Sequence, residues 1–470
     1  MTGTKVWSGR LLSVFAFSLL FSYILTFQFE GQLLYSLLDF HEAKGSGLIL
    51  GTILAHFAGL FSAGFFVNSI KAARYILLAG MGVCVVLTMP FFFAPSSVWL
   101  GSLIVGAYAS GCAVAAWGYY LQAFTPRHER IKTCADALIF SNIMMIIINV
   151  VALKVSPFLG LALAIFGLLV GLGLIWVLGV DLEDSKHEKV EKRPRDELRR
   201  SLLLLCIFVA IITIDSGLMY EVINPAFEHL TGLVSWYWAV PYIVALVVLR
   251  YLPKKIKHAN VLYAGMAMIM GAFIAFMALG RQAPDYLVVD TLMLAACGIF
   301  DLFWWSILGE LLDYTEYPAR VFGIGLSANV AGVLFGGIVG MIITSIGLSS
   351  AKVAVLALTV ICVTLVILPL LNRQLVLFLK NHAYLAVYES MSTSEQTAVL
   401  GKIDPLDPLT MREQEVLQLL LAGKSNREIA ATLFITEHTV KTHARNIFSK
   451  YAVHSRAELI SSLLKGDGNS

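Results

Sequence analysis

The sequence predicts an all-α protein, in which a polytopic bundle of membrane helices is joined to a small C-terminal domain of four helices. Three observations support this fold class. First, 58% of the 470 residues are hydrophobic and only 14% are charged, whereas soluble domains contain about a quarter charged residues. Second, twelve apolar segments precede residue 372, each near the roughly 20 residues that cross a bilayer as a helix. Third, residues 409–465 have the mixed composition of a soluble domain.

The twelve apolar segments form the first predicted domain, residues 1–371. A charged stretch, residues 181–200, is expected to be a loop that separates two six-helix halves, residues 1–180 and 201–371. The segments are about Leu11–Phe29, Ser46–Val67, Tyr75–Phe93, Val98–Phe124, Thr133–Val155, Pro157–Val180, Ser201–Tyr220, Val234–Leu252, Val261–Leu279, Tyr286–Leu308, Val321–Ile346 and Val353–Leu371.

Basic residues are distributed unevenly between the loops of the two sides. One set of loops and ends is rich in Lys and Arg, whereas the opposite loops hold only Lys44, Lys154, Arg281 and Lys352. Because basic loops stay in the cytoplasm and an even number of spans returns the chain to its starting side, both termini are predicted to be cytoplasmic. The predicted location is therefore multi-pass in the cell membrane (inner or plasma membrane), with the lipid bilayer as a partner.

Residues 409–465 contain signals for four helices. Three pairs of residues have the spacing of a capping box, in which each partner caps the backbone of the other. Thr436 can cap the third helix, and Gly423 is placed to end the first. The pairs are Thr410–Glu413, Ser425–Glu428 and Ser455–Glu458, and the helices are about Met411–Leu421, Asn426–Leu433, Glu437–Tyr451 and Arg456–Leu464.

The third of these helices has two different faces. One face repeats apolar residues at helical spacing, and the other exposes basic and hydroxyl residues near the helix start. A short helix, a tight turn and a helix of this kind form a helix-turn-helix, whose second helix enters the major groove of DNA. There Lys and Arg bond guanine edges, and Thr contacts base edges or the thymine methyl group. The apolar face holds Val440, Ala444, Ile447, Phe448 and Tyr451, and the polar face holds His438, Lys441, Thr442 and Arg445.

On these residues the segment resembles the DNA-binding domain of LuxR/GerE-type transcription regulators. The resemblance implies base contacts by Lys441, Thr442 and Arg445, and contacts with the DNA backbone by Asn426, Thr439 and His443. It also implies dimerisation through the fourth helix, so a homodimer on DNA is expected. The alternative for a single polar residue is a solvated helix surface. The matching residues include Leu409-Thr410, Arg412-Glu413, Glu415-Val416-Leu417, Gly423, Ser425-Asn426, Glu428-Ile429-Ala430, Leu433, Ile435, Thr439-Val440-Lys441, His443, Asn446-Ile447, Lys450 and Arg456.

Two six-helix halves joined by a charged loop resemble the major facilitator superfamily. That family carries an Asp-Arg pair in a Gly-led basic loop after its second helix. Here the corresponding stretch is Gly64–Arg74, in which Asn68 and Ser69 stand where Asp and Arg are expected. This departure questions transport activity more than it questions the fold. Residues 372–408, with their polar last part, are predicted to be a cytoplasmic tether.

Ionisable residues in the apolar segments are candidates for a binding site, because a charge inside a membrane is costly without a partner or a cavity. Asp215 and Asp301 are predicted to contact a polar or cationic small molecule in a central cavity between the halves. The alternative is that they bond to neighbouring helices. His56, Asp136 and Asp290 are weaker candidates, and Asp290 and Asp301 are expected to share a helix face.

Catalytic and cofactor motifs are missing from the sequence. The six cysteines lie in apolar runs without the spacing of metal ligands, and neither a phosphate-binding Gly-Lys-Ser/Thr loop nor a nucleophile elbow occurs. We therefore expect no catalytic site, no metal and no cofactor. The leading hypothesis is a membrane-bound LuxR-type transcription regulator whose facilitator-like domain senses an unknown small molecule. The alternatives are a secondary transporter with a C-terminal regulatory DNA-binding domain, and a passive membrane anchor.

Overall fold

The computed structural model contains two compact units. Met1–Glu191 and Leu202–Leu368 form the membrane unit, and Lys192–Ser201 and Pro369–Ser470 form the C-terminal unit. The part of the chain that the structure describes is helical and contains no strand. The described residues are 3–29, 31–42, 46–178, 195–251, 258–346, 352, 355–371, 407–421, 424, 426–451, 453, 456 and 459.

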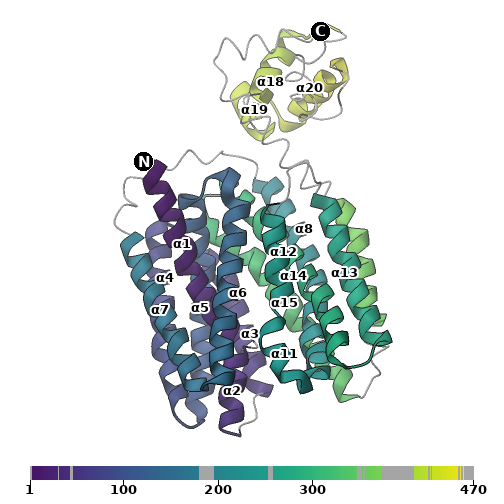
Figure 1. The fold of residues 1–470 in the computed structure, drawn as a ribbon. Coiled ribbons are helices and arrows are strands. Elements are labelled where there is room, and N and C mark those ends of the chain that lie inside the picture. The colour runs from purple at the N-terminus through teal and green to yellow at the C-terminus, as the bar shows by residue number, and fades with distance from the viewer. Residues whose placement is uncertain are drawn as a thin grey trace. The chain divides into compact units, whose positions relative to one another are not determined.

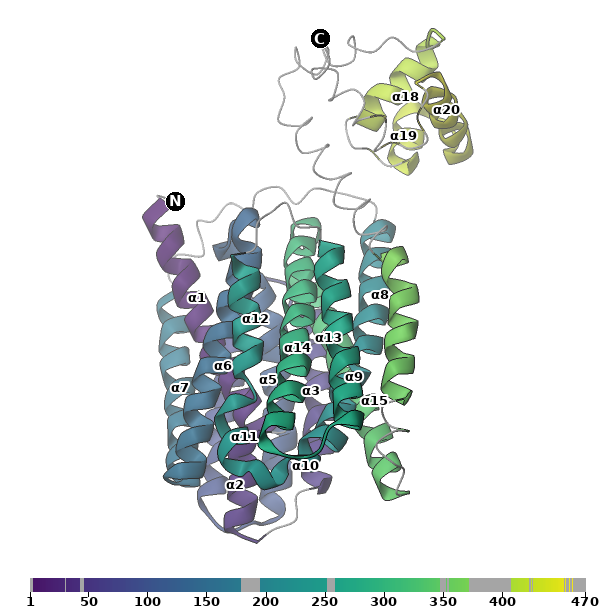
Figure 2. The same ribbon diagram turned by 45° about the vertical axis from the view of Figure 1, so that its right-hand side comes forward.

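The membrane unit consists of long helices that run side by side (Figures 1 and 2). Its first half holds α1 (Gly3–Tyr23), α2 (Gln32–Phe40), α3 (Ser46–Phe66), α4 (Ile70–Thr88), α5 (Ser97–Phe124), α6 (Arg130–Lys154) and α7 (Pro157–Leu178). Its second half holds α8 (Arg195–Ile212), α9 (Ile214–Leu218), α10 (Asn224–Ala226), α11 (Thr231–Tyr237), α12 (Val240–Arg250), α13 (His258–Ala278), α14 (Ala283–Leu311), α15 (Pro318–Ser345) and the helix Val355–Leu371. Short π or 3₁₀ turns extend several of them, namely η1 (Ile24–Gln28), η2 (Met89–Phe92), η3 (Arg127–Glu129), η4 (Met219–Ile223), η5 (Glu228–Leu230) and η6 (Leu312–Tyr314).

Ten of the described helices are long and apolar enough to cross a membrane, and two shorter apolar helices, Val240–Arg250 and Val355–Leu371, accompany them. These twelve coincide with the twelve predicted segments, so the predicted all-α, polytopic fold class is confirmed. Only 33% to 67% of each long apolar window is buried inside the protein. The remaining apolar side chains face outward, as lipid-facing helices require.

Most helices pack within their own half, whereas α15 packs on α3 and α5 of the first half as extensively as on α9. In the first half α5 packs on α3 and α4, and α7 packs on α1 and α4; in the second half α14 packs on α12 and α13, and α15 on α9. The halves meet where α3, α5 and α6 contact α11, α12, α14 and α15.

Two predicted segments are broken helices. Within the expected span Val234–Leu252, α11 ends at Tyr237 and α12 starts at Val240, because Pro241 in the first turn of α12 has no amide hydrogen for a preceding turn. The seventh segment breaks at Thr213, whose hydroxyl donates to the carbonyl oxygens of Val209 (2.8 Å) and Asn329 (3.2 Å). A side chain that competes for helix carbonyls in this way bends a helix.

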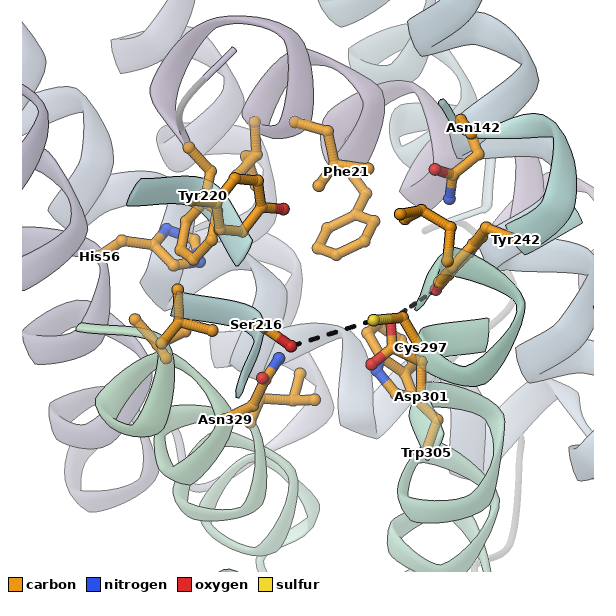
Figure 3. Close-up of a pocket in the computed structure, with 18 of the residues that line it drawn as sticks. Phe21, His56, Asn142, Ser216, Tyr220, Tyr242, Cys297, Asp301, Trp305 and Asn329 are labelled. Carbon is orange, nitrogen blue, oxygen red and sulfur yellow. Dashed lines mark hydrogen bonds between the residues drawn. The ribbon is translucent and has the colours of Figure 1, made fainter. Parts of the chain in front are cut away.

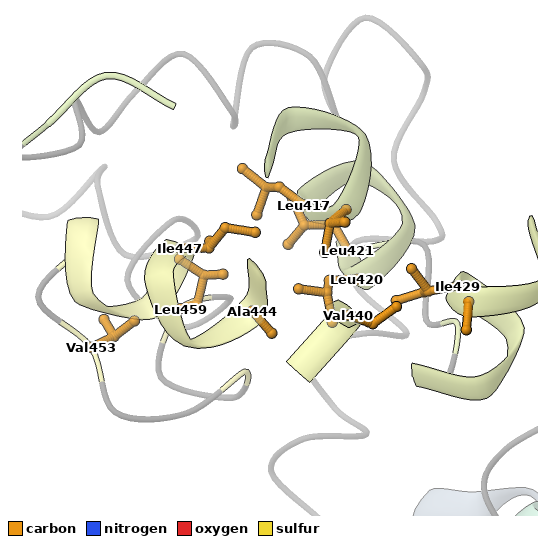
Figure 4. Packing of buried hydrophobic residues seen from close by; sticks show 11 residues of the cluster. Leu417, Leu420, Leu421, Ile429, Val440, Ala444, Ile447, Val453 and Leu459 are labelled. Carbon is orange, nitrogen blue, oxygen red and sulfur yellow. The ribbon is translucent and has the colours of Figure 1, made fainter. Parts of the chain in front are cut away.

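The C-terminal unit contains α18 (Met411–Leu421), α19 (Asn426–Leu433) and α20 (Glu437–Lys450), close to the first three predicted helices. Thr410 and Glu413 form the predicted capping box, and the Thr436 hydroxyl accepts from the amide of Thr439 at the start of α20. Figure 4 shows the apolar side chains of the three helices packed together. The buried core consists of Val416, Leu417, Leu420, Leu421, Ile429, Ala430, Val440, Ala444, Ile447, Val453 and Leu459, with Phe448 and Tyr451 partly buried against it.

Several predictions fall on residues outside the described part. These are residues 181–194 of the predicted loop, residues 372–406 of the predicted tether, the helix stop at Gly423, and the caps at Ser425 and Ser455. Of the predicted fourth helix Arg456–Leu464 only Arg456 and Leu459 are described. The proposed dimerisation helix therefore stays a prediction.

Candidate DNA-binding helix and central cavity

The polar face of α20 is available to a partner. His438, Lys441 and Arg445 are exposed, and their spacing of three and four residues places them on one side of the helix. Lys441 and Arg445 form no ion pair or hydrogen bond with other described residues. Two free cationic side chains one turn apart can donate to phosphate oxygens or to guanine edges.

The remaining candidates are more closely tied to the protein. Thr442 is half-buried, and its hydroxyl donates to the carbonyl of His438 at 3.1 Å, which turns it toward the helix backbone. Thr439 shares a hydroxyl contact of 2.9 Å with Thr436. His443 is half-buried on α20, and Asn426 is half-buried at the start of α19. The structure thus brings six of the seven candidates together on α20.

A buried ion pair fixes α20 to α18. Lys450 Nζ lies 2.8 Å from Glu413 Oε2 and also donates to the carbonyl of Pro408 at 2.9 Å. The same Glu413 oxygen accepts from the amide and the hydroxyl of Thr410. Burial by itself would raise the pKa of Glu413, but the bonds from Lys450 and Thr410 outweigh it and hold that pKa below its ordinary value.

The turn between α19 and α20 has an unusual residue. Phe434 has φ = 55°, in the left-handed region, and its side chain is 94% exposed. The amide of Ile435 donates to the carbonyl of Ala430 at 3.0 Å, which makes this turn a Schellman motif with Phe434 at the position usually held by glycine. Sequence reasoning did not identify this strained position.

A cavity lies at the seam between the two halves of the membrane unit. Phe21, His56 and Asn142 line it from the first half, and residues of the η4 turn, α12, α14 and α15 line it from the second (Figure 3). Its volume is about 140 Å³. Both halves therefore contribute residues to the wall of one partly open cavity.

Asp301 is the predicted ligand-binding residue that reaches this cavity. The Tyr242 hydroxyl donates to Asp301 Oδ2 at 2.6 Å, and the side chains of Ser216, Cys297 and Asn329 lie around the pair (Figure 3). The weak contact between Ser216 Oγ and Cys297 Sγ measures 4.0 Å. Sequence reasoning missed Tyr242 and Asn329. The Pro241 break would have been a signal, because it starts a helix at the cavity.

The other predicted aspartate lies elsewhere. Asp215 is 1% exposed, does not line the cavity, and neither of its carboxylate oxygens has a hydrogen-bond partner among the described residues. Asp290 is also buried outside the cavity. Thus α9 brings Ser216 rather than Asp215 to the cavity wall, and Asp215 and Asp301 do not form one site there.

His56 joins the cavity to a buried polar network. Its Nδ1 lies 3.2 Å from both the Ala107 carbonyl and the Ser110 hydroxyl, and that hydroxyl donates to Gln28 Oε1 at 2.6 Å. Every member of this chain is buried in the first half. The network fixes the imidazole ring and satisfies polar groups that would otherwise be costly inside a membrane.

Ion pairs cross the seam near one end of the helices. Asp136 of α6 binds Arg10 of α1 at 2.9 Å and Arg250 of α12 at 2.5 Å. Arg130 of α6 binds Asp313 at 2.6 Å and donates to the carbonyl of Gly309 at 2.8 Å. The pairs of Asp136 with Arg250 and of Arg130 with Asp313 link the first half with the second, whereas Arg10 and Asp136 both belong to the first half.

The stretch that departs from the facilitator pattern also contacts the second half. Arg320 of α15 donates to the carbonyl of Gly64 at 3.1 Å. Ser69, at the position where an arginine was expected, caps α4 by accepting from the amide of Ala72 at 3.1 Å. This loop is therefore held by a backbone contact from Arg320 and by a helix cap.

Comparison with known proteins identifies the C-terminal domain. Residues 407–463 match the family described as bacterial regulatory proteins, luxR family. A nitrate/nitrite response regulator protein homolog of Haemophilus influenzae is 57% identical over 53 residues, 11% of this chain and 26% of that protein. The CsgBAC operon transcriptional regulatory protein of Escherichia coli is 55% identical over 53 residues, 11% and 24% respectively. The chain thus spans about a quarter of the length of these curated relatives, and its C-terminal domain is a LuxR-family helix-turn-helix domain.

Solved structures identify the fold of the membrane unit. The human organic anion transporter MFSD10 is similar with a TM-score of 0.56 at 13% identity, over 79% of this chain and all of that one. A bacterial homologue of the iron transporter ferroportin has a TM-score of 0.55 at 13% identity, over 79% and 99% of the two chains. At these identities the likeness is one of fold. The chain is a multi-pass membrane protein with a major facilitator-like bundle and a LuxR-type DNA-binding domain.

Proposed function

We propose that this protein is a membrane-embedded transcription regulator in which the facilitator-like bundle senses a small molecule and controls DNA binding by the C-terminal domain. One observation carries the proposal. A LuxR-family domain, whose exposed α20 face carries two cations without a partner among the described residues, shares a chain with a bundle that has a cavity at the seam of its halves. The same chain can therefore bind a ligand and read DNA.

The proposed mechanism is a shift between two packings of the halves. A ligand changes such an equilibrium only if it binds one packing more tightly, and a cavity lined from both halves meets this requirement. Opening the seam would break the pairs of Asp136 with Arg250 and of Arg130 with Asp313. The change would reach DNA by altering how two C-terminal domains pair, since pairing raises the effective concentration of the second domain.

Several finer points belong to this proposal. The basic loops favour a cytoplasmic location of both termini in the cell membrane, where the domain can reach DNA. Lys441, Thr442 and Arg445 would contact bases, and Asn426, Thr439 and His443 the DNA backbone, while His438 belongs to the same DNA-binding face. A homodimer on DNA is proposed through the fourth helix.

The test of DNA reading is crosslinking and sequencing of DNA bound in cells. The wild type is expected to occupy discrete sites that vanish in a Lys441→Ala/Arg445→Ala variant but persist in the control Gln418→Ala, an exposed position on α18. Equal occupancy in wild type and double variant would exclude α20 as the reading helix.

The test of sensing is a version without residues 1–380, which should occupy DNA without response to the signal. A full signal response in that version would exclude the membrane unit as the sensor.

A second candidate is a secondary transporter whose C-terminal domain regulates its own operon. The cavity between the halves and the fold shared with transporters favour it, and the Asn68-Ser69 departure counts against it. Uptake or efflux by sealed vesicles that is lost in Asp301→Asn would support this candidate.

A further inference from the structure

The charge of the cavity is unusual for the membrane unit. Asp301 is the single formally charged residue among those that line it, and its lining contains no Lys or Arg. Elsewhere the interior carboxylates of Asp136 and Asp313 each face two arginines. In the part of the chain that the structure describes, Asp301 has no cationic partner and accepts one hydrogen bond, from Tyr242.

This arrangement leaves a carboxyl acceptor directed into a mostly apolar, partly open cavity. Asp301 is only half-buried, and the exposed part of its side chain borders the cavity. A carboxylate in such a space is stabilised best by a charged donor, because charge-assisted hydrogen bonds are stronger than neutral ones. An anionic ligand would instead meet like charge at low dielectric, which is costly.

The aromatic residues that line the cavity around Asp301 can pack against the apolar part of an organic cation. Trp305 lies one turn along α14 from Asp301, and Phe21, Phe29, Tyr220 and Trp238 line the rest of the space. Aromatic faces attract ammonium groups and the alkyl carbons attached to them. The Asn329 amide and the Ser216 hydroxyl next to Asp301 can accept further N–H bonds (Figure 3).

The size of the cavity limits the ligand. The available room is about 140 Å³, and one water needs on the order of 10–15 Å³ on this measure. The cavity therefore has space for a small organic molecule, such as one ring with a short side chain.

We propose that the cavity binds a small organic monocation, with its ammonium group on Asp301 and its apolar ring against Phe21 and Trp305. This inference rests on the proposed function, because it names the class of signal that the membrane unit would sense. It assigns Asp301 as the residue that selects for positive charge, and Tyr242 as the residue that positions its carboxylate.

Three matched probes test the charge preference on the purified full-length protein in lipid nanodiscs. Phenethylammonium, 2-phenylethanol and phenylacetate have one ring and about the same size, and differ in the charge of the head group. Calorimetry is expected to give a Kd for phenethylammonium at least tenfold lower than for the alcohol, and no binding of the carboxylate. Failure of the ammonium probe to bind, or a preference for phenylacetate or the alcohol, would overturn the proposal.

Amino-acid substitutions test which residue causes the preference for a positively charged ligand. Asp301→Asn should raise the Kd of phenethylammonium at least tenfold and leave that of 2-phenylethanol within threefold, whereas Asp301→Glu should keep the order of the probes. Asp290→Asn is the matched control, since Asp290 is a buried aspartate on the same helix outside the cavity. Unchanged ammonium affinity in Asp301→Asn would overturn the assignment. If that variant does not fold, the order of the probes on the wild type still decides the ligand class.

The outcome can be separated from that of the regulator proposal. If phenethylammonium binds through Asp301 but DNA occupancy in cells is the same with and without it, the ligand class stands and the sensing role fails. If occupancy responds to another compound through the membrane unit while the ammonium probe does not bind, the ligand class fails and the regulator proposal stands.

Discussion

Arg250 and Asp136 connect the two halves of the membrane unit: Nε of Arg250 on α12 lies 2.5 Å from Oδ1 of Asp136 on α6. The other oxygen of Asp136 binds Arg10 of the first half at 2.9 Å. The side chains of Arg10, Asp136 and Arg250 are 5%, 13% and 24% exposed. One mostly buried carboxylate thus compensates two arginines, one from each half, and its loss leaves Arg250 without this ion pair and Arg10 with Glu129 alone.

Asp136→Asn is expected to open this end of the seam. Removing one member of a buried ion pair costs about 3–5 kcal/mol, which is enough to raise the population of an open form more than tenfold. Cys134 lies two residues before Asp136 on α6 and is fully buried, so its reactivity reports opening of the seam. Its alkylation by a maleimide, followed by mass spectrometry on the protein in nanodiscs, should accelerate at least tenfold. Glu129→Gln is the control, because Glu129 pairs with Arg10 within the first half; equal rates in both variants would contradict a role of the cross-half pair.

Gly217→Ala is expected to destabilise the membrane unit. A Cβ atom at Gly217 would overlap the backbone carbonyl of Val333 and the backbone nitrogen of Gly337, so α9 and α15 would have to separate. Overpacking of this kind costs about 1–3 kcal/mol. The Tm of the purified protein should fall by several degrees. Gly337→Ala, on α15, is the control, because a Cβ there meets no atom within 4 Å; the same Tm change in both variants would contradict the close helix contact as the cause.

Acid is expected to loosen α18 through Glu413. Because the folded-state pKa of Glu413 lies below its ordinary value of 4.5, its stabilisation is fully present above that value and is lost as the pH falls through the lowered pKa. Hydrogen-exchange protection of α18 in the full-length protein, corrected for intrinsic rates, should fall over this range. Glu413→Gln should show lower protection at neutral pH and little change with acid. A pH profile that Glu413→Gln leaves unaltered would assign the acid response to another group.

Phe434→Asn is expected to stabilise the C-terminal domain. The left-handed conformation costs a non-glycine residue roughly 1–2 kcal/mol, and Asn tolerates it better. Since the ring is 94% exposed, little apolar burial is lost with it. Hydrogen exchange in α19 and α20 should slow by an amount equivalent to about 0.5–1 kcal/mol. Met411→Gln, at another exposed apolar position, should have a smaller effect. Faster exchange in Phe434→Asn would contradict this prediction and would show that the Phe434 ring makes stabilising contacts in the native protein.

The sequence predicted most of the fold because hydropathy and helix caps are local signals. The twelve apolar segments, the capping box at Thr410 and the N-cap at Thr436 correspond to helices in the structure. The break at Thr213 was not predictable, because the hydroxyl bonds to the carbonyl of Asn329, 116 residues away. The positive φ of Phe434 was missed because aromatic residues seldom adopt it.

The candidate sites were less accessible to sequence reasoning. The face of α20 follows from helical spacing alone, so its exposed residues were identified. The cavity depends on tertiary packing, which brings Asp301 to it together with Tyr242, and places Asp215 elsewhere. The pairs of Asp136 with Arg10 and Arg250 span 126 and 114 residues. Hydropathy and helix-cap patterns are local and do not predict contacts between residues so far apart in the sequence.

The helix α14 carries Asp301 in the cavity and, eight residues later, the Gly309 carbonyl that accepts from Arg130 of the first half. At 1.5 Å per residue these points are roughly 12 Å apart along one continuous helix. Because both points lie on one continuous helix, a displacement of α14 at Asp301 would also move the Gly309 carbonyl. Under the proposed sensing function, α14 alone would connect a molecule bound at Asp301 to the contact between the halves at Arg130.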